Sequence, residues 1–120
     1  INETTIIAKL VAKAKVDYFG FLNKKYIEIE CKQTKHEYFD MLLIKHHQLN
    51  YLKYVHDCGC LAYVFVYFEL YDKVIALNYE QLLKCKQAAK KNALPYKMVA
   101  EHGIELEIIY PGVLNLKKLL

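Results

Sequence analysis

The stretch "KKYIEIECKQT" (residues 24–34) decides the fold, because its apolar and charged residues alternate with a period of two. This alternation predicts a β-strand with two different faces. Positions 27, 29 and 31 make one face apolar, whereas Glu28, Glu30 and Lys32 occupy the other face at intervals of about 7 Å. Two carboxylates and an ammonium on one face indicate either a solvated sheet surface or an active site, and the strand taken alone favours the solvated surface.

The composition indicates a single globular domain. The chain has 120 residues, of which 55% are hydrophobic, and this is enough to bury a core without disulfides. The formal net charge is +4 and all 17 basic residues are lysines, so any contact with phosphate is made by point charges and not by arginine forks. The four cysteines lack the paired spacing of a zinc site, so we expect free thiols in a reducing cytoplasm. No apolar run is long enough to predict a membrane span.

Apolar periodicity predicts an α/β domain with a mixed sheet flanked by helices. Residues 16–33 fit a β-hairpin around a polar break at 22–25, after one or two strands in the first 21 residues. A helix is expected within residues 43–58, because Ile44, Gln48 and Tyr51 share a helical stripe and Gly59 follows as a stop signal. The remaining expected elements are a loop at 34–42, strands at 61–68 and 73–78, a helix at 79–91, a short helix between Pro95 and Gly103, a strand at 104–110 and a terminal helical turn.

The hairpin gathers candidate catalytic residues. Asp17 lies on its first strand and Glu30 and Lys32 lie on its second, so folding the hairpin can bring all three side chains together. Two carboxylates with open coordination positions suit Mg²⁺ or Mn²⁺, which take further ligands from water and phosphate. Lys32 would stabilise charge on an attacked phosphate or orient a water molecule. Gln48, in the inward stripe of the predicted helix, could reach the same site and position a water or a metal ligand.

Each of these residues also has a plain structural interpretation. The charged strand face could be solvated, Asp17 could cap a turn toward Gly20, and Gln48 could be a satisfied core or rim amide. These three interpretations must all hold together to explain the pattern. A metal-dependent nuclease site, by contrast, uses all of these residues in one geometry, and we therefore prefer it.

Asp17 followed by Glu30-Cys31-Lys32 has the form of the D…E-x-K signature of PD-(D/E)xK nucleases, with twelve residues between the two acids. The surrounding stretches "VDYFGFLNKKYIEIECKQTK" and "HHQLNYLKYVHDCGCLAYVFVYF" resemble the RecU family of bacterial Holliday junction resolvases more specifically. A D-Y-x-G turn, an E-x-K strand, a following Thr-Lys and a His-Gln helix recur in that family in this order. The likeness continues through "LPYKMVAEHG" (residues 94–103) and covers nearly the whole chain.

The resemblance implies a restriction-endonuclease-like fold and a homodimeric, Mg²⁺-dependent endonuclease of the bacterial cytoplasm. Such an enzyme makes paired nicks in four-way DNA junctions during recombination and repair. Asp17 and Glu30 would be the metal ligands, with Mn²⁺ as a substitute for Mg²⁺, Lys32 would be the catalytic lysine and Gln48 the helix residue at the site. The implied partners are branched DNA, a second copy of the chain, and recombinase and branch-migration proteins.

Lysines around the hairpin are the expected phosphate contacts. They are Lys9, Lys13, Lys15, Lys24, Lys25 and Lys35. The sequence starts without Met and almost directly in a strand pattern, so we expect a single nuclease domain, 1–120, whose residues 1–15 belong to a truncated N-terminal stalk region. Two alternatives remain: a related nuclease acting on other DNA structures, and a DNA-binding or recombinase-modulating module whose catalysis has decayed.

Overall fold

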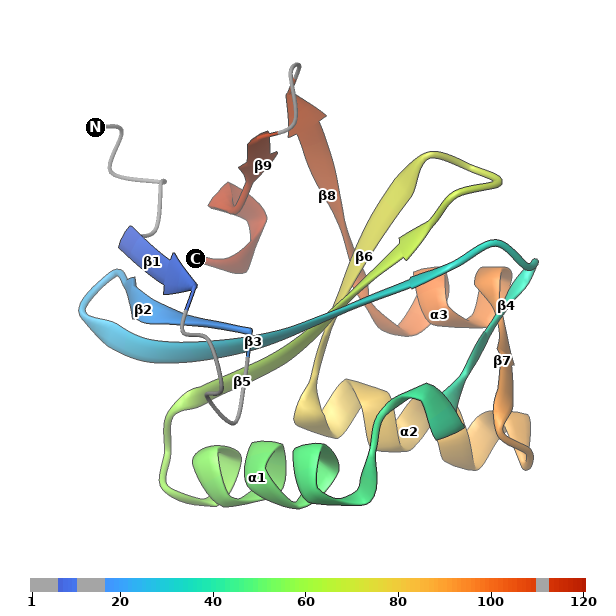
Figure 1. The fold of residues 1–120 in the computed structure, drawn as a ribbon, viewed down its shortest axis with the longest axis horizontal. Helices are drawn as coiled ribbons and strands as arrows, with labels where there is room; N and C mark the ends of the chain where they lie inside the picture. Colours follow the sequence, from blue (N-terminus) through green and yellow to red (C-terminus); the bar gives the residue numbers. More distant parts are fainter. Residues whose placement is uncertain (1–6, 11–16, 110–112) are drawn as a thin grey trace.

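The computed structural model describes residues 7–10, 17–109 and 113–120. A mixed seven-stranded sheet with the order β1-β2-β3-β5-β6-β8-β9 forms its centre (Figure 1). The strands of this sheet are β1 (Ile7–Leu10), β2 (Tyr18–Leu22), β3 (Lys25–Thr34), β5 (Leu61–Phe68), β6 (Lys73–Asn78), β8 (Ile104–Ile109) and β9 (Val113–Asn115). The helices are α1 (His46–Asp57), α2 (Tyr79–Ala89) and α3 (Tyr96–His102), together with the short 3-10 helices η1 (Met41–Leu43) and η2 (Lys117–Leu119). The predicted α/β domain with a mixed sheet and flanking helices is thereby confirmed.

The hairpin β2–β3 gives the sheet its longest strand. Its two-residue loop consists of Asn23 and Lys24, which have φ angles of 50° and 67°. Positive φ at both loop positions gives a turn whose twist matches that of the flanking strands. The hairpin expected at 16–33 is therefore confirmed, with strands at Tyr18–Leu22 and Lys25–Thr34. β3 then pairs in parallel with β5, and α1 lies in the crossover that a parallel pair requires.

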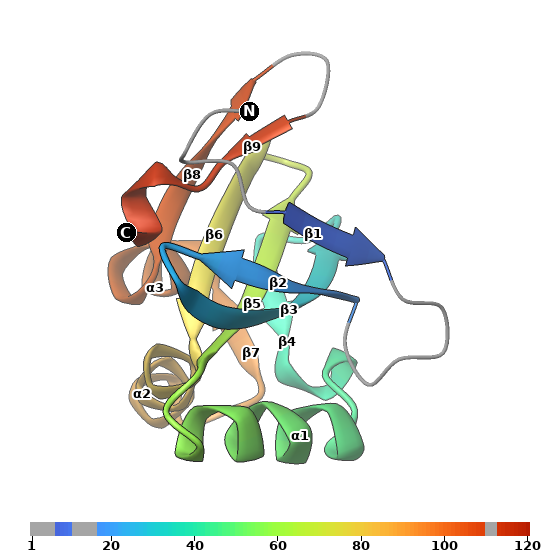
Figure 2. The same cartoon turned by 90° about the vertical axis from the view of Figure 1, so that its left-hand side faces the viewer.

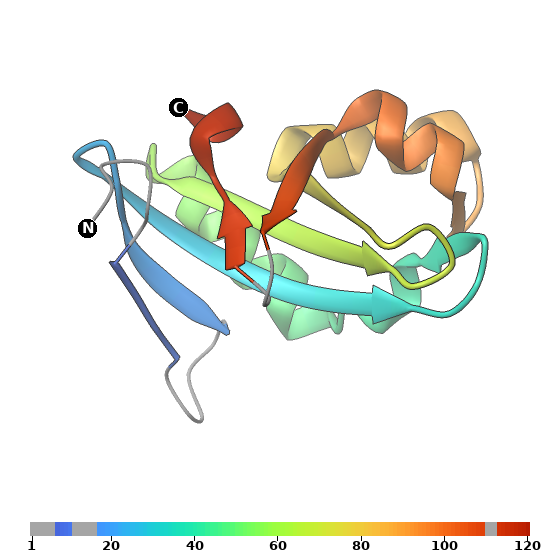
Figure 3. The ribbon, with the colours of Figure 1, turned by 90° about the horizontal axis from the view of Figure 1, so that it is seen from above.

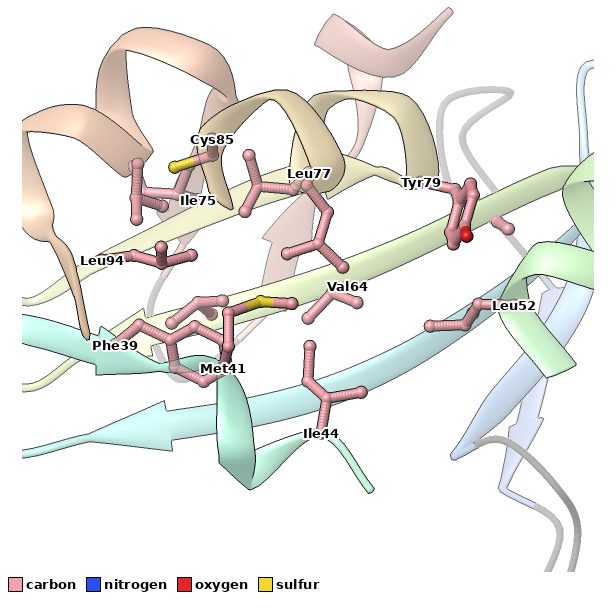
Figure 4. Packing of buried hydrophobic residues seen from close by; sticks show 14 of the residues in the cluster. Phe39, Met41, Ile44, Leu52, Val64, Ile75, Leu77, Tyr79, Cys85 and Leu94 are labelled. Atoms are coloured by element: carbon pink, nitrogen blue, oxygen red, sulfur yellow. The ribbon is translucent and has the colours of Figure 1, made fainter. Parts of the chain in front are cut away.

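The three α-helices cover one face of the sheet, as Figures 1 and 2 show. Buried side chains between the helices and the sheet form the larger core, in which Leu52 of α1 faces Val64 of β5 and Leu77 of β6 (Figure 4). A smaller core on the opposite face includes Ile27 and Ile29 of β3. Seen from above, the sheet is strongly curled, with the strands at its two ends turned out of the plane of its centre (Figure 3). The central strands β3 and β5 are therefore covered on both faces.

Most predicted elements are confirmed, but the shortest strands were missed. The strand predictions at 61–68 and 73–78 match β5 and β6, and Pro95 precedes α3, whose C-terminus is capped at Gly103. The loop expected at 34–42 is wrong, because it contains η1 and the strand β4 (Tyr38–Asp40), which pairs with β7 (Ala93–Pro95). β9 was also missed. A strand of three residues is too short to show an alternating pattern, so the sequence gives no signal for it.

The four cysteines are free thiols, with Cys85 buried in the larger core and Cys31 exposed on β3. Within the described residues, no helix has both the length and the apolar character needed to cross a bilayer. The predicted stalk segment, 1–15, lies outside the described residues except for β1, which pairs with β2.

Candidate active site

The charged face of β3 is buried and not solvated. Glu28 and Glu30 are each only 3% exposed, which is close to the 0% of Ile27 and the 2% of Ile29 on the opposite face. Helix α1 reaches this face with its side chains, because Tyr51 contacts Glu28 and Gln48 contacts Lys32 of the same strand. The solvated-surface interpretation is therefore wrong: the polar face is covered by a helix that follows later in the chain.

Asp17 lies immediately before β2, where the hairpin pairing places Tyr18 opposite Ile29. Its Oδ2 atom accepts a hydrogen bond of 2.8 Å from the backbone N–H of Cys31. The carboxyl group is thus held at β3, where it also hydrogen-bonds to the Glu30 carboxyl group. Asp17 therefore makes a contact across the hairpin, and the interpretation of Asp17 as a local turn cap toward Gly20 is not needed.

Burial and the proximity of Asp17 alter the protonation of Glu30. The pKa of Glu30 is raised from 4.5 to about 8, first by burial and then by the hydrogen bond and the negative charge of Asp17. The Lys32 ammonium opposes this increase. Two carboxylates so close together are unfavourable when both are ionised, so without a cation the pair retains a proton near neutral pH.

The donor set fits a hard divalent cation. Within the described residues, no cluster of three or more His, Cys, Asp or Glu side chains is placed to hold a metal. Asp17 and Glu30 together offer two carboxylates. Mg²⁺ is commonly bound by one or two carboxylates and completes its octahedral shell with waters and substrate phosphate oxygens. The pair therefore suits Mg²⁺ better than a metal that needs a closed set of four protein ligands.

Gln48 links Lys32 to the start of α1. The Lys32 Nζ atom donates to Gln48 Oε1 over 3.1 Å, and the same oxygen accepts the backbone N–H of Lys45 at 2.9 Å. Lys45 is the N-cap residue of α1, and its ammonium cannot accept a hydrogen bond from the free N–H groups of the helix start. Gln48 supplies one acceptor, which takes the backbone N–H of Lys45. One glutamine side chain thus fixes both the helix terminus and the half-buried lysine ammonium.

The structure thereby brings all four residues of the predicted site together. Asp17 contacts Glu30, the charge of Lys32 acts on Glu30, and Lys32 bonds to Gln48. The sequence reasoning missed a further contact, a hydrogen bond of 3.2 Å from the Tyr51 hydroxyl to Glu28 Oε1. The spacing in the sequence could have indicated this contact, because Glu28 precedes Glu30 by two strand positions and Tyr51 follows Gln48 by one helical turn.

The glutamate at position 28 also affects two tyrosines. Burial, followed by the charge of Glu28 and its hydrogen bond, raises the pKa of Tyr26 to about 12. The same causes in the same order raise the pKa of Tyr51. Both hydroxyls therefore stay protonated and act as hydrogen-bond donors beside the carboxylate strand.

Of the predicted phosphate-binding lysines, the three whose side chains the structure describes lie on both sides of the site and not in one cluster. Lys24 and Lys25 are exposed at the hairpin end of β3, and Lys35 is exposed just beyond its other end. The rise along a strand of this length separates these two groups by roughly 30 Å. The backbone of Lys9 lies in β1 opposite Phe19, whereas Lys13 and Lys15 lie outside the described residues.

Comparison with known proteins agrees with the hairpin signature. The chain matches the family described as RecU, Recombination protein U, over residues 2–120. It is 32% identical over its full length to the Holliday junction resolvase RecU of Ureaplasma parvum, of which it covers 71%. It is 32% identical to the Holliday junction resolvase RecU of Oceanobacillus iheyensis and 30% identical to that of Staphylococcus carnosus, over 69% and 85% of the chain.

The chain belongs to the RecU family, and the resemblance inferred from its sequence is confirmed. The relatives are named as resolvases of Holliday junctions, which are structure-specific endonucleases, so the expectation of this enzyme class is confirmed at the level of the family. The chain spans about half the length of the Oceanobacillus and Staphylococcus proteins, with 44% and 51% of their residues covered.

Proposed function

We propose that this chain is the nuclease domain of a divalent-metal-dependent enzyme that cuts four-way DNA junctions by paired nicks. The observation that carries the proposal is the contact network joining Asp17, Glu30, Lys32 and Gln48 on the buried face of β3. Family membership supports the substrate, because the matched relatives are named for the Holliday junction. The mixed sheet with its E-x-K strand is consistent with a restriction-endonuclease-like fold, which we include in the proposal.

In this proposal Asp17 and Glu30 hold Mg²⁺, with Mn²⁺ as a substitute. When bound, the cation supplies Lewis-acid polarisation of a phosphoryl oxygen and a lowered pKa for a coordinated water. Asp17 is oriented by the Cys31 N–H, so its other oxygen can serve as a ligand without loss of that hydrogen bond. Losing the shared proton is the condition for both carboxylates to bind the metal.

Lys32 has the role of stabilising negative charge on the attacked phosphate. Its ammonium is held by Gln48 Oε1, which is fixed in turn by the Lys45 N–H at the helix terminus. A charge that is oriented before the reaction starts costs little reorganisation in the transition state. Gln48 is therefore a positioning residue for Lys32 in this proposal.

Two chains are needed to cut two strands, so we include a homodimer in the proposal. Paired nicks require two active sites at a fixed spacing, and twofold symmetry provides such a spacing for a junction with two equivalent strands. Lys24, Lys25 and Lys35 at the two ends of β3 would contact phosphates on either side of the scissile bond. Recombinase and branch-migration proteins are proposed as further partners.

The decisive experiment compares substrates of matched sequence. The chain is incubated with Mg²⁺ and a synthetic four-way junction, a linear duplex or a flap, and parallel reactions contain Mn²⁺, Ca²⁺ or EDTA. We expect symmetric paired nicks in the junction with Mg²⁺ or Mn²⁺, no cleavage in EDTA, and little cleavage of the duplex. Sedimentation velocity on the same sample measures whether the active species is a dimer.

Two results would overturn the proposal in favour of the alternatives. Equal cleavage of junction, flap and duplex would identify a nuclease for other DNA structures. Junction binding without cleavage at any Mg²⁺ or Mn²⁺ concentration would identify a binding module whose catalysis has decayed. Single, uncoupled nicks made by a monomer would contradict the paired mechanism alone.

A further inference from the structure

One side of α1 lines a pocket that the proposed chemistry does not use. Its described lining residues are His47, Asn50, Tyr51 and Tyr54, and its volume is about 560 Å³. Their spacing of i, i+3, i+4 and i+7 places all four on one helical face, next to the stripe that Leu52 buries in the core. The volume lies in the range of pockets that take small ligands. We call this site the tyrosine pocket.

The tyrosine pocket is joined to the strand of the proposed active site through Tyr51. Tyr51 donates its hydroxyl to Glu28, which lies two positions before Glu30 on the same face of β3. Gln48, which holds Lys32, lies one helical turn before Tyr51. A strand whose phosphate lies at Lys32, beside the proposed metal ligands, therefore has an adjacent nucleotide within reach of the pocket.

The described lining residues have the chemistry of a base-binding site. The rings of Tyr51 and Tyr54 lie 6.3 Å apart with an angle of 28° between their planes, and Tyr54 is 64% exposed. No lysine is among the described lining residues. His47 and Asn50 offer polar groups to the edge of a bound ring, and tyrosine faces stack on nucleobases of any sequence.

The hairpin adds aromatic rings on the same side of the sheet. Strand pairing sets Phe19 opposite Glu28 and Phe21 opposite Tyr26, so these side chains share the face that α1 covers. The Tyr26 ring lies 6.3 Å from that of Phe19 and 5.7 Å from that of Phe21, which is 64% exposed. Aromatic surface thus follows the carboxylate strand on both the helix and the hairpin.

We propose that the tyrosine pocket receives an unstacked nucleobase of the DNA strand whose phosphate lies at Lys32, beside the proposed metal ligands. Tyr54 stacks on the base, and Asn50 and His47 bond to its edge. Unstacking a base costs least where pairing is already interrupted, so the pocket favours branched or single-stranded DNA over a continuous duplex. This inference rests on the proposed function for the position of the strand, and it adds a nucleotide-binding subsite to it.

The test measures stacking without cleavage. Oligonucleotides that carry 2-aminopurine near the branch point are titrated with protein in EDTA, using a four-way junction and a single strand. The chain contains no tryptophan, so the probe can be excited apart from the protein. We expect wild-type protein and Tyr54→Phe to change the probe emission in the same way, because both keep the aromatic ring.

Tyr54→Ala should lose this emission change and weaken binding of the single strand by roughly 5- to 150-fold, the usual value of one base–aromatic stack. Tyr71→Ala is the matched control, because Tyr71 is 41% exposed and stacks on Tyr96, away from the site. This control should bind and report like the wild type.

Unchanged emission and affinity in Tyr54→Ala would overturn the inference. A loss of dimer in Tyr54→Ala, with DNA binding per chain intact, would assign the pocket to a second protein copy and would also overturn it. These outcomes are independent of the proposed nuclease activity, because binding is read in EDTA. Failure of the wild type to cleave junctions would count against the proposed function alone.

Discussion

The two faces of β3 are buried to the same degree but differ in chemistry. Ile27 and Ile29 on one face are 0% and 2% exposed, and Glu28 and Glu30 on the other are each 3% exposed. Burying the isoleucines stabilises the fold by removing apolar surface from water, whereas burying carboxyl groups costs free energy unless they are paired or protonated. The comparison teaches that stability and the proposed activity come from opposite faces of one strand, and mutations on each face should separate them.

The largest effect is expected from removing either carboxylate of the metal pair. Asp17→Ala and Glu30→Ala should each abolish junction cleavage, because one carboxylate is left to hold the cation. Junction binding should stay intact or become slightly tighter, since a negative charge facing the phosphate is removed. Single-turnover cleavage in Mg²⁺ and binding in EDTA measure the two effects.

Glu101→Ala provides the control, because Glu101 is an exposed carboxylate on α3 that is remote from the hairpin in sequence. It should cleave at the wild-type rate. If Asp17→Ala and Glu30→Ala also cleaved at that rate, the metal site would have to lie elsewhere.

A smaller loss is expected at Lys32. Lys32→Met keeps the length of the side chain and removes the ammonium that Gln48 orients. Losing one preorganised electrostatic partner typically lowers the rate by about 10² to 10³. Single-turnover cleavage at saturating Mg²⁺ measures this loss, and circular dichroism establishes that the variant is folded.

Lys53→Met is the matched control for this substitution. Lys53 lies on α1 and forms an exposed ion pair of 2.8 Å with Asp57, and such pairs contribute little. It should leave cleavage unchanged. A folded Lys32→Met variant that cleaved within a few-fold of wild type would remove Lys32 from the catalytic set.

The opposite face should respond in stability and not in rate. Ile29→Ala should lower the free energy of unfolding by about 2 to 5 kcal/mol, and Ile29→Val by about 0.5 to 1.5 kcal/mol, because each leaves a cavity in the smaller core. Urea denaturation measures both values. The cleavage rate per folded Ile29→Val molecule should equal that of the wild type, and a lowered rate would show that the two faces are coupled.

The hairpin could be predicted because its information is local. Alternation predicted β3, the polar break predicted the turn, and folding the hairpin between them placed Asp17 near Glu30. Helix α1 was predicted from its stripe of inward-facing residues, and Gly59, with a φ angle of 83°, follows the end of the helix as the predicted stop signal. These features depend on residues close together in the chain.

The environment of the hairpin could not be predicted in the same way. Alternation shows that a strand has a polar face, but it does not show whether water or a helix covers that face. The cover comes from α1, and the hydrogen bond between Tyr51 and Glu28 joins residues 23 positions apart. The short pair β4 and β7 spans an even longer separation, with Phe39 opposite Leu94. Both depend on tertiary packing.

The smallest expected effect is a pH dependence of the free energy of unfolding. It tests the carboxylate face of β3 in the absence of DNA. In metal-free protein the pKa of Glu30 is about 8, against an ordinary value of 4.5 that applies to the unfolded chain. Between these values the folded state binds a proton that the unfolded state releases, so the free energy of unfolding falls as pH rises from about 4.5 to 8. Glu30→Gln cannot ionise and should lack this part of the pH dependence.

Urea midpoints in EDTA should therefore be similar for wild type and Glu30→Gln near pH 4.5, and the variant should be the more stable protein near pH 8. Glu101→Gln serves as the control at an exposed position and should follow the wild type. Adding Mg²⁺ should stabilise the wild type more at pH 8 than at pH 5, because the cation competes with the shared proton for the ionised pair. Identical pH profiles for wild type and Glu30→Gln would mean that the pKa of Glu30 is not raised in the folded protein, and the geometric argument for a metal between Asp17 and Glu30 would lose its electrostatic support.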